Sequence, residues 1–209
     1  MVDTALTIVP ILAVLIVGII SPGPSFILVA RTAVAFSHAA AVASAVGMAS
    51  GASLLATAAL LGLSALFRQI PGAYVALKLV GGTYLLYLAY QTWRAAGRPV
   101  LDERRSAAPR GGLARHFGLA LGTMVSNPKA AVQYGVIFAA MLPRSPSTAV
   151  TVALPAAVFA LEASWYIVVA LALSAPATRN VYLRAKLAVD RVAGAVLAAL
   201  GIKLLLSTR

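Results

Sequence analysis

The sequence predicts an all-α integral membrane protein: one transmembrane domain over residues 1–209, with six membrane-spanning helices arranged as two inverted three-helix repeats. Hydrophobic residues make up 61% of the 209 residues and charged residues 11%, and the mean hydropathy is +0.94. Soluble domains have about 45–50% apolar and 25% charged residues. Six long apolar runs follow one another, and prolines interrupt two of them at points about half the chain apart. These three observations predict a membrane protein built from two similar halves.

A helix needs about 20 apolar residues to cross a bilayer. The runs that reach this length are 4–31, 39–66, 71–93, 113–142, 148–175 and 188–206. We expect the first run to be retained, because it follows Asp3 instead of a basic segment and has no small-x-small cleavage pattern. The first and fourth runs are longer than a straight helix needs, which favours two half-helices joined at a break.

The first run is interrupted by Ser21-Pro22-Gly23-Pro24-Ser25 and the fourth by Asn127-Pro128-Lys129. Proline has no N–H group and clashes with the preceding turn, so a helix breaks or kinks there. At membrane depth the freed backbone groups are tolerated only inside protein or a water-filled cavity. Lys129 adds a charge, which costs about 2.5–3.5 kcal/mol at the bilayer centre on insertion scales and usually marks a substrate or ion pathway. The two breaks therefore predict a binding site.

The net charge of +12 follows the predicted topology. Most of the basic residues lie in or beside the loops after the first, third and fifth runs, and few lie on the opposite side. The positive-inside rule places this basic side, including the loop at about 94–112, in the cytoplasm and both termini outside. We interpret the loop as a solvated segment that touches anionic lipid headgroups, and we expect no nucleic-acid binding.

An internal repeat supports the two halves, which we place at about 1–95 and 113–209. The segment 79–88 is similar to 191–200, and the two proline breaks occupy equivalent positions. Three spans in each half force the halves into opposite orientations, the inverted-repeat plan of many secondary transporters. Small residues such as Gly47, Gly51 and Gly81 predict close helix packing; they permit a homodimer without requiring one.

Glu162 lies near the middle of the fifth run, at a depth that matches Lys129. Either the two form a pair that only stabilises both charges, or at least one acts on substrate or protons. A carboxyl group in apolar surroundings favours its neutral form, as a proton carrier requires, unless Lys129 keeps it ionised. We therefore select Glu162 as a candidate substrate-binding residue and as the candidate proton-coupling residue.

Two further residues have two interpretations each. Lys78 is either an anchor at the outer face or a site residue, and Tyr84 either packs between helices or lines the cavity. We include both among the candidate substrate-binding residues. Asp190 and Arg191 begin the sixth run, and we interpret them as boundary charges at the cytoplasmic face.

Several classes of protein are excluded or unsupported. The chain has no cysteine, which excludes disulfides, iron–sulfur clusters and thiolate zinc sites. Two isolated histidines at predicted loop ends make a poor metal site, so none is expected. Phosphate-binding and hydrolase motifs are absent from the sequence, so we predict neither an enzyme nor a bound cofactor.

The motifs Pro22-Gly23-Pro24, Lys78 followed by Gly81–Leu88, and Asn127-Pro128-Lys129 resemble those of the lysine exporter and homoserine-threonine efflux family, LysE/RhtB. The resemblance covers the whole chain. It implies secondary-active export of amino acids or related small metabolites across the bacterial inner membrane, with protons as the expected coupling ion. It also implies that Pro22, Gly23, Pro24, Asn127, Pro128 and Lys129 belong to the transport site.

The sequence departs from this family at one point. Members commonly have an acidic residue after a glycine in the second span, whereas Gly51 is followed here by Ala52. Glu162 falls opposite Gly51 when the two halves are aligned, so we interpret it as the relocated acid. The departure leaves the substrate class open.

Two other functions remain as alternatives. One is a structural or assembly protein of the membrane, in which the breaks only allow helix packing. The other is a cation or metal efflux pump, against which the single midplane acid and the lack of His or Cys ligands in the runs argue.

Overall fold

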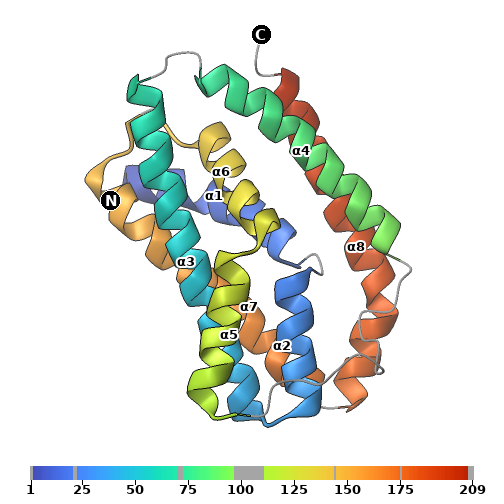
Figure 1. The fold of residues 1–209 in the computed structure, drawn as a ribbon. Helices are drawn as coiled ribbons and strands as arrows, with labels where there is room; N and C mark the ends of the chain where they lie inside the picture. Colours follow the sequence, from blue (N-terminus) through green and yellow to red (C-terminus); the bar gives the residue numbers. More distant parts are fainter. Residues whose placement is uncertain are drawn as a thin grey trace.

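The computed structural model describes residues 2–20, 23–69, 73–96, 111–143, 145–174 and 176–206. The regular structure in these residues is entirely helical, as predicted (Figure 1). The helices are α1 (Val2–Ile20), α2 (Pro24–Ala35), α3 (His38–Gln69), α4 (Ala73–Ala95), α5 (Leu113–Val125), α6 (Pro128–Met141), α7 (Thr148–Ser174) and α8 (Pro176–Leu206). Most of the predicted basic loop, residues 97–110, lies outside the described part of the chain.

Both interrupted runs break where the prolines predict. α1 ends at Ile20 and α2 begins at Pro24, while α5 ends at Val125 and α6 begins at Pro128. Each new half-helix has proline at its start, where the missing N–H is not needed and the fixed φ angle suits the helix. The two motifs thus act as paired stop and start signals.

The helix that contains the sixth predicted run begins before that run. α8 begins at Pro176, well before residue 188, so the segment assigned to a loop is the first part of a long helix. The basic residues in this first part of α8 kept it out of the apolar runs that the sequence predicts as spans. Lys186, however, is buried against the end of α4, and this tertiary contact supports the helix.

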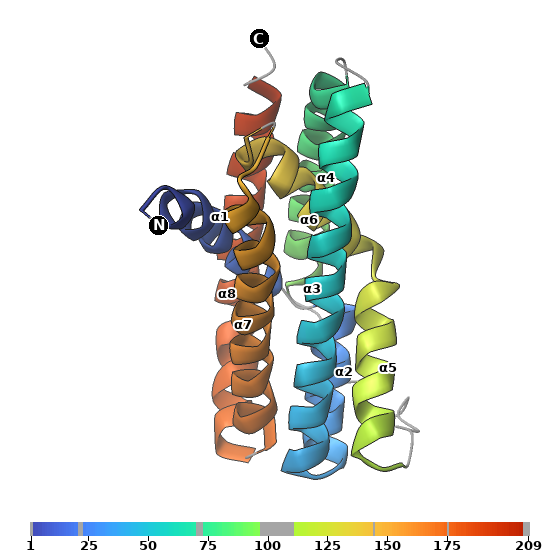
Figure 2. The same ribbon diagram turned by 90° about the vertical axis from the view of Figure 1, so that its left-hand side faces the viewer.

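Length and apolarity alone identify two of the described helices as membrane spans, over His38–Leu63 and Thr148–Ser174. A third span is added if α1 and α2, which are bent by 62° at their break, count as one. Figure 2 shows α1 leaning steeply away from the bundle, whose long helices run nearly side by side. The chain is therefore a helical membrane protein, and the six-span arrangement is taken up below as a proposal.

The helices form two groups that meet through contacts of α6 with α4 and of α1 with α8. α3 packs along α5 and α7, and α4 packs along α8 at one side of the molecule (Figure 1). Glycines allow both close approaches: a Cβ atom at Gly51 would lie 2.7 Å from Met124 Cβ, and one at Gly201 would lie 2.8 Å from the Gly82 carbonyl oxygen. These small residues pack within the chain, and a homodimer stays a prediction.

Candidate functional site

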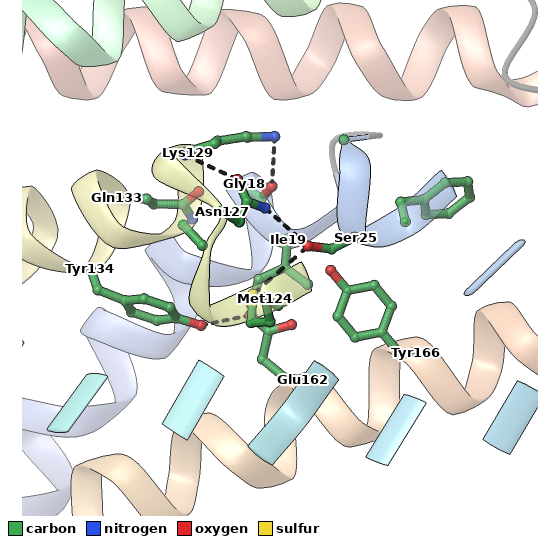
Figure 3. A pocket seen from close by; sticks show the side chains of 13 residues that line it. Gly18, Ile19, Ser25, Met124, Asn127, Lys129, Gln133, Tyr134, Glu162 and Tyr166 are labelled. Atoms are coloured by element: carbon green, nitrogen blue, oxygen red, sulfur yellow. Dashed lines mark hydrogen bonds between the residues drawn. The ribbon is translucent and has the colours of Figure 1, made fainter. Parts of the chain in front are cut away.

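The two helix breaks face one another around a small cavity in the middle of the bundle (Figure 3). Its volume is about 30 Å³. The end of α1, the start of α2, the α5–α6 break and the middle of α7 all contribute to its wall. The polar side chains that line it are Ser25, Asn127, Lys129, Gln133, Tyr134, Glu162 and Tyr166.

Asn127 joins the two breaks. Its side-chain oxygen accepts a hydrogen bond from the Lys129 backbone N–H at 3.0 Å and so caps α6. Its amide group donates to Ser25 Oγ at 3.0 Å, at the start of α2. Ser25 Oγ in turn donates to Met124 Sδ at 3.8 Å. Because Asn127 and Ser25 are both buried, this chain of hydrogen bonds fixes the breaks relative to each other.

Lys129 reaches from the start of α6 to the end of α1. Its ammonium group donates to the Gly18 carbonyl oxygen at 3.4 Å. The last carbonyls of a helix carry partial negative charge, which favours a cation there. Gly23 lies beside the same side chain, since a Cβ atom at Gly23 would be 3.7 Å from Lys129 Nζ. Lys129 therefore contacts the first break directly.

Gln133 makes a second link from α6 to α1. Its amide group donates to the Leu15 carbonyl oxygen at 3.4 Å, and its side chain is buried. Position 18 must be glycine for this geometry, because a Cβ atom there would lie 2.5 Å from Gln133 Cδ. Lys129 and Gln133 thus occupy successive turns of α6 on the side that faces α1.

Glu162 enters the cavity from α7 and is only 3% exposed. Tyr134 donates its hydroxyl proton to Glu162 Oε1 at 2.6 Å, whereas Oε2 has no hydrogen-bond partner among the described residues. Tyr166, one turn further along α7, points its hydroxyl towards Ser25 (Figure 3). A buried oxygen without a partner is costly, so Oε2 is an open acceptor within the site.

Lys129 and Glu162 do not form the direct pair that was one interpretation of the sequence. Within the described residues, Lys129 donates to Gly18 and Glu162 accepts from Tyr134. Both side chains line the same cavity.

The remaining sequence-selected residues have different positions. Pro24 and Pro128 start α2 and α6 at the breaks without lining the cavity. Pro22 lies outside the described residues, as does the side chain of Lys78 in α4. Tyr84 packs with the apolar cluster between α4, α6 and α8 and contacts Tyr87, so the structure does not bring it to the cavity.

Sequence reasoning missed Ser25, Gln133 and Tyr134. A signal was available for two of them, because Gln133 and Tyr134 follow Lys129 by about one helical turn in an otherwise apolar run. Ser25 is the second residue of α2. It belongs to the site because Asn127, which is distant in the sequence, donates a hydrogen bond to its hydroxyl group.

The model of the LysE type translocator family matches residues 16–208 of the chain. The chain belongs to this family. Over 196 residues it is 32% identical to the threonine efflux protein of Escherichia coli K12, covering 92% of this chain and 94% of that protein. It is 30% identical over 131 residues to the homoserine/homoserine lactone efflux protein of Salmonella typhimurium LT2, covering 62% of each. No solved structure gives a significant match.

Membership of the LysE type translocators makes this chain a transport protein and not an enzyme. Its relatives are bacterial, and its long helices are apolar, so it is a bacterial membrane protein. The family resemblance drawn from the proline and lysine motifs is confirmed.

Proposed function

We propose that this translocator is a secondary-active exporter of amino acids or related small metabolites across the bacterial inner membrane, and that it exchanges them for protons. The efflux names of its relatives support the substrate class. The observation that carries the proposal is the cavity between the two breaks, which is lined by one partly buried cation, Lys129, and one buried carboxyl group, Glu162. An amino acid presents the opposite pair, a carboxylate and an ammonium group.

The substrate carboxylate would be bound by Lys129 and by backbone N–H groups at the start of α2. That helix start carries no side-chain cap among the described residues, and the N-terminal end of a helix attracts anions. The substrate ammonium would be bound by the open Glu162 Oε2 and by the last carbonyls of α1. Broken helices of other transporters bind substrates in this way.

The described cavity is too small for an amino acid. A cavity of about 30 Å³ holds one or two water molecules, so an amino acid enters only if the lining helices separate. Movement of α1–α2 relative to α5–α6 would stretch the hydrogen bonds from Asn127 and Lys129 first, since these cross between the breaks. Opening to either side in turn would give alternating access.

Glu162 is the proposed proton-coupling residue. A proton arriving from outside would neutralise its carboxylate and release the substrate ammonium. Tyr134 would keep the carboxyl group in place, because Oε1 can accept its hydroxyl hydrogen bond in both protonation states. The exchange therefore needs no further ion at this position.

We also propose six spans in two inverted repeats, with both termini outside. In support, α3 packs along α7 and α4 along α8, so that each helix meets its counterpart from the other half. The two breaks likewise occupy corresponding places, between α1 and α2 and between α5 and α6. The excess of basic residues in the loops of one side supports the orientation.

Proteoliposomes loaded with radiolabelled L-threonine or L-homoserine test the proposal. We expect the wild type to release substrate when an inward proton gradient is imposed. Lys129→Ala and Glu162→Gln should each lower export about ten- to hundredfold, since a hydrogen bond to a charged group contributes about 1.5–3 kcal/mol. Ser164→Ala, an exposed position on α7, is the matched control. Undiminished export in both site variants would refute the proposed arrangement.

A further inference from the structure

Two apolar cavities lie between the α4–α8 pair and its neighbours α1 and α6. The first has a volume of about 230 Å³ and is lined by residues of α1, α4, α6 and α8. The second has a volume of about 350 Å³ and lies between α1 and α8. Both are much larger than the cavity of about 30 Å³ between the two breaks. The two groups of helices are therefore incompletely packed against each other.

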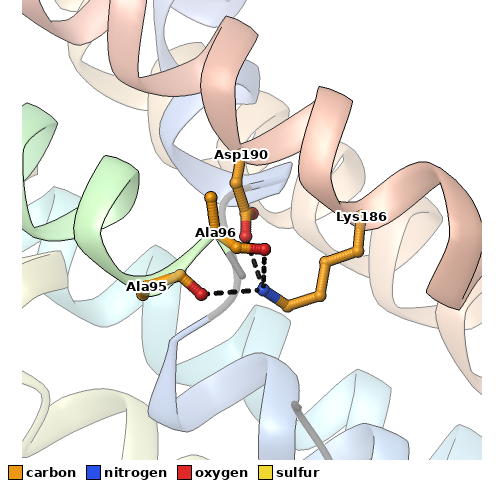
Figure 4. A network of polar contacts seen from close by, with 4 residues as sticks. All are labelled: Ala95, Ala96, Lys186 and Asp190. Carbon is orange, nitrogen blue, oxygen red and sulfur yellow. Dashed lines mark hydrogen bonds and ion pairs between the residues drawn. The ribbon is translucent and has the colours of Figure 1, made fainter. Parts of the chain in front are cut away.

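Within the pair, polar contacts hold α4 to α8 (Figure 4). Lys186 donates to the carbonyl oxygens of Ala95 at 3.1 Å and Ala96 at 3.3 Å, and it forms an ion pair with Asp190 Oδ2 at 2.6 Å. Asp190 is only 1% exposed, so it is buried in the protein, although its place in the sequence had indicated a boundary charge. These contacts fix α4 against α8, whereas the two cavities lie on the side of the pair that faces α1 and α6.

The two cavities follow one another along the same two helices. The lining residues of α8 fall within 188–196 in the second cavity and within 200–204 in the first. They recur every three or four residues, so they share one face of the helix. On α1 the lining residues are Val14, Val17 and Ile20, which are also three apart. We call the two cavities together the α1–α8 groove; from residue 188 to residue 204 it is about 24 Å long.

One end of the groove carries a charge. Among the described residues that line the groove, Lys203 is the only one that is not apolar. Lys203 is exposed and lies three residues before the end of α8, or about 4.5 Å from it. Met141, the last residue of α6, lines the groove as well, and Figure 1 shows α6 and α8 ending towards the same end of the molecule. The groove thus has a cation near the helix ends and an apolar body.

Three kinds of occupant do not fit this groove. Apolar cavities of about 150 Å³ stay free of water. A helix is about 10 Å across with its side chains, so 24 Å of helix would fill about 1,900 Å³, more than the two cavities together. An extended peptide would bring backbone N–H and C=O groups for which apolar walls offer no hydrogen-bond partners. An acyl chain is narrow and has no polar groups, and lipid surrounds any membrane protein.

We propose that the α1–α8 groove binds an anionic phospholipid. One acyl chain lies along α8, and the phosphate group interacts with the Lys203 ammonium. The hydrocarbon of one leaflet is about 15 Å deep, half of the bilayer core, so a groove about 24 Å long is long enough for a whole chain. Lysine side chains bury their stem on apolar surface and keep the charged head at the membrane interface, where phospholipids carry their phosphate. Lipid binding here is independent of what the protein transports.

The lipid site would adjoin the cavity between the breaks without being part of it. Ile20, the last residue of α1, lines the groove, while its neighbour Ile19 lines the cavity between the breaks. The acyl chain would therefore pack against the end of α1 on the side that faces α8.

Native mass spectrometry of the purified protein tests the headgroup contact, with phosphatidylglycerol and phosphatidylcholine of identical acyl chains as probes. We expect the wild type to bind phosphatidylglycerol about fivefold more tightly, the effect of one basic residue on an anionic lipid. Lys203→Gln should remove this preference and Lys203→Arg should keep it. Arg191→Gln, a control that removes another exposed charge of α8 outside the groove, should also keep it.

Two further variants test the apolar part of the groove. Ala140→Leu fills the first cavity from α6, and Val192→Phe fills the second from a position that is 65% exposed. Each should weaken the binding of both lipids about fivefold. Ala58→Leu, at an exposed position of α3, is the matched control and should bind both lipids like the wild type.

The proposal is overturned if the wild type binds the two lipids equally, if Lys203→Gln keeps the preference, or if both groove-filling variants bind lipid like the wild type. Two other results would assign the groove to a different occupant and also overturn it. One is a dimer in the mass spectrum that Ala140→Leu abolishes, which would identify a second copy of the chain. The other is tighter binding of oleate than of phosphatidylglycerol, which would identify a free fatty acid.

Discussion

Replacing Tyr134 with phenylalanine removes one hydroxyl group from the site and leaves the ring packing in place. The lost hydrogen bond is the 2.6 Å contact to Glu162 Oε1, and the carboxyl group is 3% exposed. Both of its oxygens would then lack a partner within the described residues. A hydrogen bond to a charged group contributes about 1.5–3 kcal/mol, and one to a neutral group about 0.5–1.5 kcal/mol. We therefore expect Tyr134→Phe to lower the free energy of unfolding by about 1.5–3 kcal/mol if Glu162 is ionised.

For a chain of this size, about 1 kcal/mol corresponds to about 2–4 °C in Tm, so the expected decrease is about 3–12 °C. Intrinsic tryptophan fluorescence of the purified protein would measure it, because the chain has two tryptophans. Tyr134→Phe combined with Glu162→Leu should recover much of the loss, since removing both polar partners leaves no unsatisfied group.

Tyr87→Phe is the control for this experiment, since Tyr87 lies on α4 and is 52% exposed. Two results would show that the contact does not stabilise the site. One is an unchanged Tm in Tyr134→Phe. The other is that Glu162→Leu lowers the stability of Tyr134→Phe by as much as it lowers the stability of the wild type.

Three other results are expected. Asn127→Ala should lower the free energy of unfolding by about 0.5–2 kcal/mol through loss of the α6 cap, and chemical unfolding would measure it; no change would mean that the cap is replaced by water. Gly201→Ala should cost about 1–3 kcal/mol, because its Cβ atom would lie 2.8 Å from a backbone oxygen of α4. Gly62→Ala, with open space around it, should be neutral or slightly stabilising; equal losses in the two would contradict the packing of α4 on α8. The chain has no cysteine, so a single introduced cysteine can be labelled selectively. A cysteine at exposed Ser126 should react with a water-soluble thiol reagent, and one at fully buried Ser44 should not. Mass spectrometry would measure the labelling, and the reverse pattern would mean that water does not reach the second break.

Local chemistry allowed most of the helix boundaries to be predicted. Proline sets where a half-helix starts whatever surrounds it, so both breaks could be placed from the sequence. The start of α8 could not, because Arg179, Arg184 and Lys186 interrupt the apolar pattern over residues 176–187. Their helix depends on contacts that appear only in three dimensions, such as that of Lys186 with the end of α4.

The candidate site was predictable in its charges but not in their partners. Depth along each run was enough to select Lys129 and Glu162, and both line the cavity. Their actual partners are a carbonyl of α1 and a hydroxyl of α6, which no spacing rule connects to them. Tyr84 was selected because it lies deep in the third run, but depth does not reveal which neighbour a helix face meets. That side chain packs towards α6 and α8.

In the proposed six-span arrangement, α1 and α2 form one span, and the 62° bend between them would account for the surplus length of the first apolar run. At 1.5 Å per residue, the 19 residues of α1 are about 28 Å long and the 12 residues of α2 about 18 Å. With α2 upright in the bilayer, the inclined α1 advances only about 13 Å along the normal, and the two together cover about 31 Å. This value matches the hydrocarbon thickness of an average membrane, about 30 Å. The bend thus lets a segment that is longer than a straight span fit within the bilayer without thickening the bilayer.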